Sequence, residues 1–321
     1  MARKILITGA AGFIGSWLTD TLLARGELVR GFDNFATGRR ENLADAAQNE
    51  KFELVEGDLR DATAVAAACV GVDAILHQGA LPSVPRSVKD PRTSHEANID
   101  GTFNLLEGAR AAGIKRVVYA ASSSAYGNQP GFPRVETMVP QPIAPYPVQK
   151  MAGELYMRSY WQVYGIETVA LRYFNIFGPR QVPDSPYSGV MAKFILQMMQ
   201  GERPTIFGDG EQGRDFTYVA NAVEANLRAL EASAEKVAGR VFNVACGGRH
   251  TLNETYAVIA RLLGFKLPAL YGPIRAGDVT NSQADISAAG AAFDYEPVVG
   301  FEEGLGLTVE WYKSQALGTR D

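Results

Sequence analysis

Several residues in the middle of the chain could carry out acid–base chemistry on a hydroxyl group. Tyr146 and Lys150 are four residues apart in PYPVQK, and Ser122, Ser123 and Ser124 stand in a row in AASSSAYG. The pKa of an unperturbed tyrosine is about 10, so it is a poor base at neutral pH unless positive charge lies close to it. On one face of a helix, the Lys150 ammonium and the helix N-terminus would supply that charge. A serine at a strand end can hydrogen-bond the same substrate oxygen while hydride leaves the carbon.

The spacing of Tyr146 and Lys150 alone is weak evidence, because such pairs are common on helix surfaces. A glycine loop near the N-terminus strengthens it. In TGAAGFIGSW, the residues Gly9, Gly12 and Gly15 follow one predicted strand and open a predicted helix. Glycines there permit a tight turn and close approach of a pyrophosphate to the N–H groups at the helix N-terminus. The loop predicts a dinucleotide site, although a purely structural turn could have the same glycines.

Asp33 bears on which dinucleotide would bind. It ends the second predicted strand, 24 residues after Gly9, where a carboxylate can accept hydrogen bonds from ribose hydroxyls. The carboxylate would repel a 2′-phosphate and so favours NAD over NADP. Arg39 and Arg40 argue for NADP, because arginine can hold the extra phosphate, but we give Asp33 more weight.

The elements that must position these residues alternate regularly along the first half of the chain. The segments KILITG, LVRGFD, FELVEGD, AILHQGA, RVVYAASS and ETVALRYFN read as strands, and residues 13–25, 101–112 and 148–164 read as helices. This pattern predicts an α/β fold with a Rossmann-like, doubly wound parallel sheet over residues 1–175. Pro- and Gly-rich pieces then predict a smaller, irregular α/β substrate domain over residues 176–321. The strand-like VFNVACG suggests that the chain returns to the first domain near residues 215–260.

Composition argues against several classes of function. The 321 residues carry a formal net charge of −4 with scattered basic residues, so we expect no nucleic-acid or membrane partner. Cys69 and Cys246 are the only cysteines, and neither they nor the three histidines have metal-ligand spacing. The apolar run near the N-terminus breaks at Gly9, as a strand entering a turn would, and no apolar stretch approaches the roughly 20 residues of a membrane span. We therefore expect a cytoplasmic protein without a metal site.

Nearly the whole chain resembles the extended short-chain dehydrogenase/reductase superfamily, in particular its NAD-dependent epimerases and dehydratases of nucleotide sugars. Besides the motifs above, the resemblance includes HQGA at 77–80, Asn98, LRYFNIFGPR at 171–180, GDGEQGRDFTYV at 208–219 and RAGDVTNSQAD at 275–285. It implies that Ser122, Tyr146 and Lys150 are catalytic. Dehydratases of the family carry an Asp-Glu pair after the catalytic hydroxyl residue, where this chain has Ser123 and Ser124. The resemblance therefore implies 4-epimerisation.

The resemblance also implies two binding sites. The NAD site is expected to comprise Gly9, Gly12, Phe13, Ile14, Gly15, Asp33, Asn34, Asp58, Leu59, Gln78, Ala80, Asn98, Tyr146, Lys150 and Tyr173. The substrate site is expected to comprise Ser83, Arg86, Ser123, Ser124, Asn175, Val190, Arg214, Arg275, Asp278 and Ser282. Arg214 and Arg275 match the diphosphate ligands, a role that suits the planar fork of arginine. Asp58 could equally be a turn or capping residue, and the loop with Ser83 and Arg86 could equally be a rigid proline-rich turn.

The resemblance implies a UDP-hexose 4-epimerase, which we expect to prefer UDP-N-acetylglucosamine/UDP-N-acetylgalactosamine and also to accept UDP-glucose/UDP-galactose. The preference depends on Ser282, since relatives restricted to glucose and galactose carry a bulky tyrosine at the matching site. Ser282 could also be merely a small loop residue. A UDP-glucuronate 4-epimerase is the nearest alternative. A catalytically idle NAD-binding sensor is another, although such a protein would be expected to have lost Tyr146 or Lys150.

The resemblance further implies a homodimer. The predicted helices at 101–112 and 148–164 correspond to the pair that forms a four-helix dimer interface in relatives. Met151, Leu155 and Tyr156 on the second helix could equally face the protein's own core.

Overall fold

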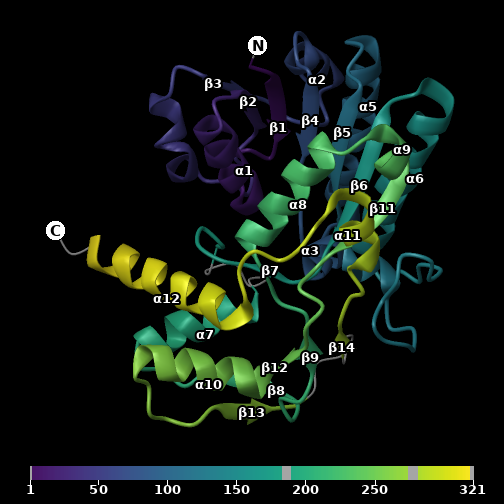
Figure 1. Ribbon diagram of the computed structural model, residues 1–321. Helices are drawn as coiled ribbons and strands as arrows, with labels where there is room; N and C mark the ends of the chain where they lie inside the picture. The colour runs from purple at the N-terminus through teal and green to yellow at the C-terminus, as the bar shows by residue number, and fades with distance from the viewer. Residues whose placement is uncertain (1, 183–188, 274–280, 319–321) are drawn as a thin grey trace.

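A seven-stranded parallel sheet forms the centre of the structure, a computed structural model that describes residues 2–182, 189–273 and 281–318 (Figure 1). The strand order is β11-β6-β5-β4-β1-β2-β3. The strands are β1 (Lys4–Thr8), β2 (Leu28–Asp33), β3 (Phe52–Glu56), β4 (Ala74–His77), β5 (Arg116–Ser122), β6 (Glu167–Tyr173) and β11 (Arg240–Val244). The order reverses at β1, which lies between β2 and β4. In such sheets ligands bind at the carboxyl ends of the strands beside that reversal.

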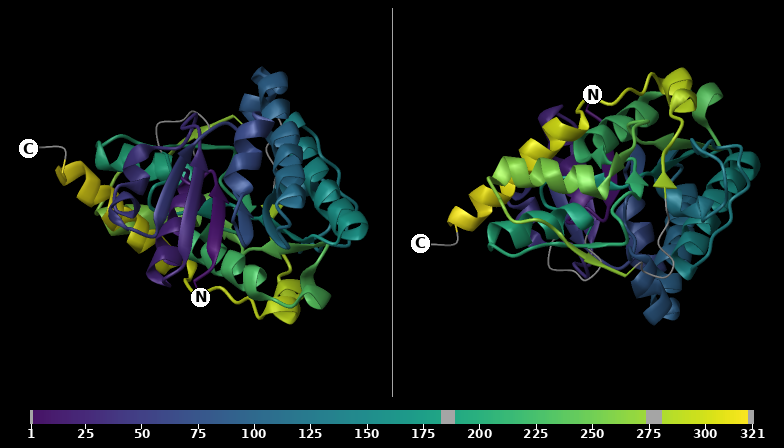
Figure 2. Two further views of the ribbon diagram at one scale, coloured as in Figure 1. Left: turned by 90° about the horizontal axis from the view of Figure 1, so that it is seen from above. Right: turned by 90° about the horizontal axis from the view of Figure 1, so that it is seen from below.

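Both faces of the sheet are buried, as the continuous apolar runs of its strands require. In β1, Ile5 and Ile7 pack into one core cluster and Leu6 packs into the other. The first cluster is covered by α1 (Phe13–Ala24), α8 (Val219–Glu231) and α11 (Ser287–Phe293). The second is covered by α2 (Ala62–Cys69), α5 (Gly101–Ala111) and α6 (Pro145–Tyr164). Figure 2 shows α2, α5 and α6 gathered side by side along the sheet.

Short elements connect these layers at the two ends of the strands. They are the 3₁₀ helices at Arg40–Leu43, Ala46–Gln48 and Ser123–Tyr126, the helices α3 (Val84–Lys89), α4 (Pro91–His95) and α9 (Ala234–Val237), and a π-helical turn at Glu96–Asp100. The row of Ser122, Ser123 and Ser124 therefore lies where β5 ends and the Ser123–Tyr126 turn begins.

A second group of elements lies beside the carboxyl edge of the sheet (Figure 1). Its helices are α7 (Val190–Met199), α10 (Leu252–Leu263) and α12 (Phe301–Gly318), which surround a separate core that includes Phe194, Ile195 and Leu305. Its strands pair in twos and threes and are β7 (Ile176–Phe177), β8 (Thr205–Phe207), β9 (Gly213–Arg214), β10 (Thr217–Tyr218), β12 (His250–Thr251), β13 (Leu270–Gly272) and β14 (Asn281–Ser282).

The predicted fold class is confirmed: the sheet is parallel and doubly wound, and the additional sheets are small. The later chain contributes β11 to the sheet beside β6, in parallel register from Arg240 opposite Val169 to Val244 opposite Tyr173. The exact division into domains at residue 175 stays a prediction. Among the described helices, none is both long enough and apolar enough to cross a membrane.

Candidate active site

Tyr146 lies in the first turn of α6, which begins at Pro145, three residues before the predicted helix start. Ala144, at the N-cap of this helix, makes no side-chain cap. Instead, the Tyr146 backbone N–H donates to Ser87 Oγ at 3.0 Å, and the Ser87 hydroxyl donates to the carbonyl of Val84 at 2.8 Å. Ser87 lies on α3 and is fully buried. A side chain from another element thus satisfies one of the N–H groups that a helix N-terminus leaves free.

Lys150 joins α6 to the sheet. Its Nζ donates to the carbonyl of Ala120 in β5 at 2.8 Å and lies 4.9 Å from the centre of the Tyr119 ring. The side chain is buried, with 4% of its surface exposed. Because β5 ends at Ser122, this contact places the start of α6 beside the serine row.

The serine row forms a small hydroxyl cluster. Ser122 Oγ and Ser124 Oγ are 2.8 Å apart, and Ser122 Oγ also accepts from the Ser124 backbone N–H at 3.2 Å. The Ser122 side chain also lies close enough to Tyr146 to favour the ionised form of its hydroxyl. The fold therefore brings together the three predicted catalytic residues, Ser122, Tyr146 and Lys150. Ser123 lies next to them and is half-buried.

Burial sets the protonation of this group. It raises the pKa of Tyr146 to about 12, and the nearby Ser122 hydroxyl only partly opposes that rise. It also lowers the pKa of Lys150 to about 7. Desolvation disfavours the charged form of both groups, and it is the largest influence on each of these two pKa values.

One helical turn beyond Lys150, Glu154 forms a buried ion pair that we did not predict. Its carboxylate accepts from Arg172 Nε at 2.9 Å and from Arg172 Nη2 at 2.7 Å. Arg172 lies on β6 and its guanidinium also packs over the Tyr126 ring at 4.6 Å. Glu154 opposes the lowering of the Lys150 pKa. The sequence did contain a signal for the position of Glu154, because Tyr146, Lys150 and Glu154 are each four residues apart and so lie on one helix face.

The glycine loop has a shape that fits a pyrophosphate. Gly9 has a φ of +68°, which favours glycine, and a Cβ on Gly15 would lie 2.0 Å from the Gly9 carbonyl oxygen. A Cβ on Gly12 would lie 3.1 Å from the same oxygen. The loop leads into the N-terminus of α1, a helix of 12 residues, with Gly12 at the N-cap. Backbone approach without side chains, at a helix N-terminus, is what a dinucleotide phosphate requires.

Asp33 lies beside this loop at the end of β2. Its carboxylate accepts from the backbone N–H groups of Ala11 at 2.9 Å and Phe35 at 2.8 Å, while burial raises its pKa. Arg40 pairs with Glu56 at 2.5 Å and stacks over the Phe35 ring at 3.9 Å. That pairing weakens the argument for a 2′-phosphate and agrees with NAD.

The other predicted cofactor residues surround the same edge of the sheet. Asn34 donates to Asp58 at 2.9 Å, and Leu59 packs against Gly79 and Gly101. The Arg60 guanidinium beside Asp58 holds the pKa of that carboxyl well below its usual range.

A second set of polar residues lies deeper along the same edge. Tyr173 donates to Gln78 at 3.1 Å, and Asn226 donates to Tyr173 at 2.6 Å. Asn98 is different, because its side chain bonds within the protein to Leu81 and Gln149 at 2.7 to 3.1 Å. This geometry suits a residue that supports the protein around the site rather than one that contacts the cofactor.

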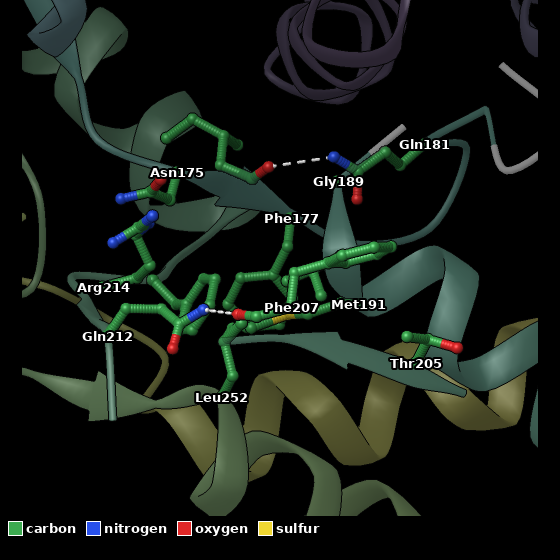
Figure 3. A pocket seen from close by; sticks show the side chains of 13 residues that line it. Asn175, Phe177, Gln181, Gly189, Met191, Thr205, Phe207, Gln212, Arg214 and Leu252 are labelled. Atoms are coloured by element: carbon green, nitrogen blue, oxygen red, sulfur yellow. Dashed lines mark hydrogen bonds between the residues drawn. The ribbon is translucent and has the colours of Figure 1, made fainter. Parts of the chain in front are cut away.

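A pocket opens between the sheet edge and the second group of elements (Figure 3). Asn175, Val190, Arg214 and Phe207 line it. In Figure 3 the side chains of Arg214 and Asn175 point toward one another. Ser282 lies next to the pocket, since β14 pairs with β9 in the register Ser282 to Arg214 and the Asn175 amide donates to Ser282 Oγ at 3.3 Å.

The remaining predicted substrate residues fall in two places. Ser83 caps α3 by accepting from the Arg86 backbone N–H at 3.4 Å. Ser83 has a φ of +99° and Asn175 a φ of +41°, values that are uncommon for residues other than glycine. Strained backbone of this kind clusters at ligand sites. Arg275 and Asp278 lie outside the described residues.

Comparisons with known proteins agree with this geometry. Residues 5–245 match the NAD dependent epimerase/dehydratase family. A UDP-glucose 4-epimerase of Mycolicibacterium smegmatis is 38% identical over 98% of this chain and 99% of its own. The structure of a UDP-N-acetylglucosamine 4-epimerase from Methanobrevibacter ruminantium, in complex with UDP-N-acetylmuramic acid, superposes with a TM-score of 0.93 at 38% identity and covers 98% of this chain and 99% of that one.

A third relative has the cofactor bound. The structure of a UDP-glucuronic acid 4-epimerase from Bacillus cereus, in complex with UDP-glucuronic acid and NAD, has a TM-score of 0.90 at 32% identity. It covers 97% of this chain and 99% of that one.

We predict that Ser87→Ala lowers kcat on the order of tenfold with little change in KM, because Tyr146 loses the hydrogen bond that fixes its backbone. Ser87→Thr keeps the hydroxyl and should restore most of the rate. Steady-state kinetics on both variants check this. An unchanged kcat for Ser87→Ala, or a loss confined to KM, would contradict the positioning role.

Proposed function

We propose that this chain, which belongs to the NAD dependent epimerase/dehydratase family, interconverts UDP-N-acetylglucosamine and UDP-N-acetylgalactosamine as its preferred pair. We propose that it also accepts UDP-glucose and UDP-galactose. At the coarser level it is a UDP-sugar 4-epimerase, an NAD-dependent isomerase. The observation that carries the finer proposal is the small residue Ser282 beside Arg214 and Asn175.

NAD, when bound, supplies the hydride acceptor, the hydride donor for the return step and the positive charge of its nicotinamide ring. Gly9, Gly12 and Gly15 would hold its pyrophosphate and Asp33 its adenosine ribose. The residues of this chain manage the proton. Tyr146 removes it from the sugar O4, Ser122 donates a hydrogen bond to that oxygen, and Tyr146 returns the proton when C4 is reduced on its other face.

Lys150 has an electrostatic task in this scheme. With a pKa lowered to about 7 by burial, it is partly protonated at neutral pH. Added positive charge beside Tyr146 lowers the cost of the phenolate, which burial alone makes high. We therefore assign the stabilisation of the Tyr146 phenolate to Lys150, strengthened by the positive charge of the bound nicotinamide ring.

Elimination chemistry has no support in this site. A dehydratase needs an acid and a base directly after the catalytic hydroxyl residue, and here those positions are Ser123 and Ser124. Ser124 hydrogen-bonds Ser122 at 2.8 Å and so reinforces the hydroxyl cluster. Epimerisation requires only that the proton and the hydride be removed and returned.

The acetylated sugar is supported by space and by hydroxyl groups. Ser282 is small and half-buried, and its Oγ accepts a hydrogen bond from Asn175. A tyrosine at this position would instead place a bulky ring there. We propose that the serine leaves room for a 2-acetamido group. Arg214 would hold the diphosphate together with Arg275.

One observation favours the second candidate, a UDP-glucuronate 4-epimerase. Arg86 lies on α3, next to Ser87 and therefore near the backbone of Tyr146. A cation there could pair with a sugar carboxylate. The first candidate stays ahead because Ser282 and the serine row suit a neutral substituent.

We also propose a homodimer formed by α5 and α6. Phe103, Val148, Leu155 and Val163 on these helices are large, apolar and exposed by 41 to 66%. Tyr156 packs on the second core cluster and against the Phe103 ring at 5.7 Å, so it contributes to the protein's own core. Leu155→Asp should convert a dimer to a monomer in analytical ultracentrifugation. A monomeric parent protein would contradict the proposal.

The function is tested by supplying each sugar in turn. Purified protein is incubated with UDP-N-acetylglucosamine, UDP-glucose and UDP-glucuronate, and the products are separated by chromatography. We expect 4-epimers of the first two, no accumulation of NADH, and a rate lower by roughly 10²- to 10⁴-fold for Tyr146→Phe. Exclusive turnover of UDP-glucuronate would select the second candidate, and near-normal turnover by Tyr146→Phe would overturn the mechanism.

Ser282→Tyr tests the sugar preference. The added ring should exclude the acetamido group and abolish epimerisation of UDP-N-acetylglucosamine, yet spare UDP-glucose. Ser282→Ala is the matched control, because it keeps the space and removes only the hydroxyl. The readout is the rate of epimerisation of each sugar when both are supplied together. Equal treatment of both sugars by Ser282→Tyr would show that the preference is set elsewhere.

A further inference from the structure

A buried carboxylate lies behind the pocket, one residue after Arg214. Asp215 has no exposed surface. Its Oδ1 accepts from the backbone N–H of Cys246 at 3.0 Å, and its Oδ2 accepts from those of Gly247 and Ala284, each at 3.1 Å. Three backbone donors on one buried carboxylate form a set of charge-assisted hydrogen bonds, which are stronger than neutral ones.

These donors come from segments far apart in the sequence. Cys246 and Gly247 follow β11, the strand that returns to the large sheet, whereas Ala284 follows β14. The sequence separations from Asp215 are 31, 32 and 69 residues. Asp215 therefore ties the edge of the large sheet to the strands that carry the proposed substrate residues.

The backbone of Asp215 also forms hydrogen bonds with the proposed substrate residues. Its N–H donates to the carbonyl of Ser282 at 2.6 Å, and its carbonyl accepts from the Asn175 side chain at 3.1 Å. Asp215 thus contacts Ser282 and Asn175 directly and neighbours Arg214 in the chain. All three are residues to which the proposed function assigns the UDP-sugar.

Within the described residues, Cys246 faces this carboxylate from the end of β11 and Tyr295 faces it from the segment after α11. His250 on β12 lies opposite the neighbouring residue Arg214. The Tyr295 hydroxyl donates to the carbonyl of Ala245 at 2.9 Å. Burial raises the pKa of Cys246 and of Tyr295, so each is neutral at neutral pH. Arg214 precedes Asp215 on β9 and its guanidinium donates to the Gly213 carbonyl at 3.0 Å.

We propose that Asp215 is a positioning residue whose negative charge holds Arg214, Asn175 and Ser282 in the arrangement that binds the UDP-sugar. Nothing in this role requires contact with the substrate. The inference rests on the proposed function, since it concerns the same UDP-sugar site. It adds a residue that acts only on substrate binding, at a distance from the glycine loop.

Asp215→Asn is the direct test. The amide keeps the size of the side chain but turns its NH₂ toward a backbone N–H, so at least one of the three bonds is lost. We expect UDP-glucose to bind on the order of ten- to a hundred-fold more weakly. Binding is measured by calorimetry in a Tyr146→Phe background, so that the ligand is not turned over. The NAD content should stay at the parent level.

Asp209→Asn is the matched control. Asp209 also accepts a backbone N–H, from Glu211 at 3.0 Å, but it is exposed and lies outside the proposed site. It should bind UDP-glucose as the parent does. Equal affinity in the Asp215→Asn and parent proteins would overturn the inference. Absence of UDP-glucose binding by the parent would instead overturn the proposed function, so the two failures are distinguishable.

A second measurement needs no folded variant at Asp215. Burial raises the pKa of Asp215 to about 6, while its three backbone hydrogen bonds oppose that rise. As the pH falls through this value, the carboxylate takes up a proton and loses an acceptor. The affinity of the otherwise unmodified Tyr146→Phe protein for UDP-glucose should then fall between about pH 7 and pH 5. The diphosphate diester of UDP-glucose has no terminal phosphate of the kind whose second pKa is about 6. An affinity that is constant across this range would overturn the inference.

Discussion

The hydrogen bond from Lys150 Nζ to the carbonyl of Ala120 is the contact on which the rest of the site depends. It fixes the first turns of α6 against the last residues of β5, and those two elements carry Tyr146 and Ser122. The lysine is buried against the strand, and burial raises the pKa of Tyr146 and lowers that of Lys150, so it disfavours the charged form of both. A buried pair that is hard to ionise is suited to a site where a bound cation completes the electrostatics.

Two further contacts hold α6 from its sides. Ser87 caps the N-terminus at Tyr146, and Glu154 pairs with Arg172 one turn past Lys150. A buried ion pair contributes little net stability on average, but removal of one partner is costly. We interpret this pair as an anchor for the direction of α6 relative to β6. Its carboxylate also keeps some negative potential near Lys150, which favours the protonated amine.

The sequence was sufficient for the parts of the structure that depend on local pattern. LVRGFD corresponds to β2 residue for residue, and the glycine spacing identified the turn in which Gly9 needs a positive φ. The helix α6 begins at Pro145, three residues before the predicted start at residue 148, because its first turn accommodates both Pro145 and Pro147. Ser87 and Asp215 were missed as supporting residues, since each acts on atoms that are 31 to 69 residues away in the chain. The burial that raises the Tyr146 pKa could not be predicted from the sequence, because it depends on the packing of distant segments.

The candidate site has a cofactor end and a substrate end. The cofactor end is built from backbone that only glycine permits, and the substrate end is built from short strands held together by the Asp215 carboxylate. In the proposed mechanism both ends meet at Tyr146, where a proton leaves O4 of the sugar while hydride leaves C4. The most direct test of this central claim is the fate of the hydrogen at C4 during turnover of UDP-N-acetylglucosamine in D₂O. The account predicts that the epimer retains protium at C4, whereas deuterium at C4 in proportion to turnover would contradict it.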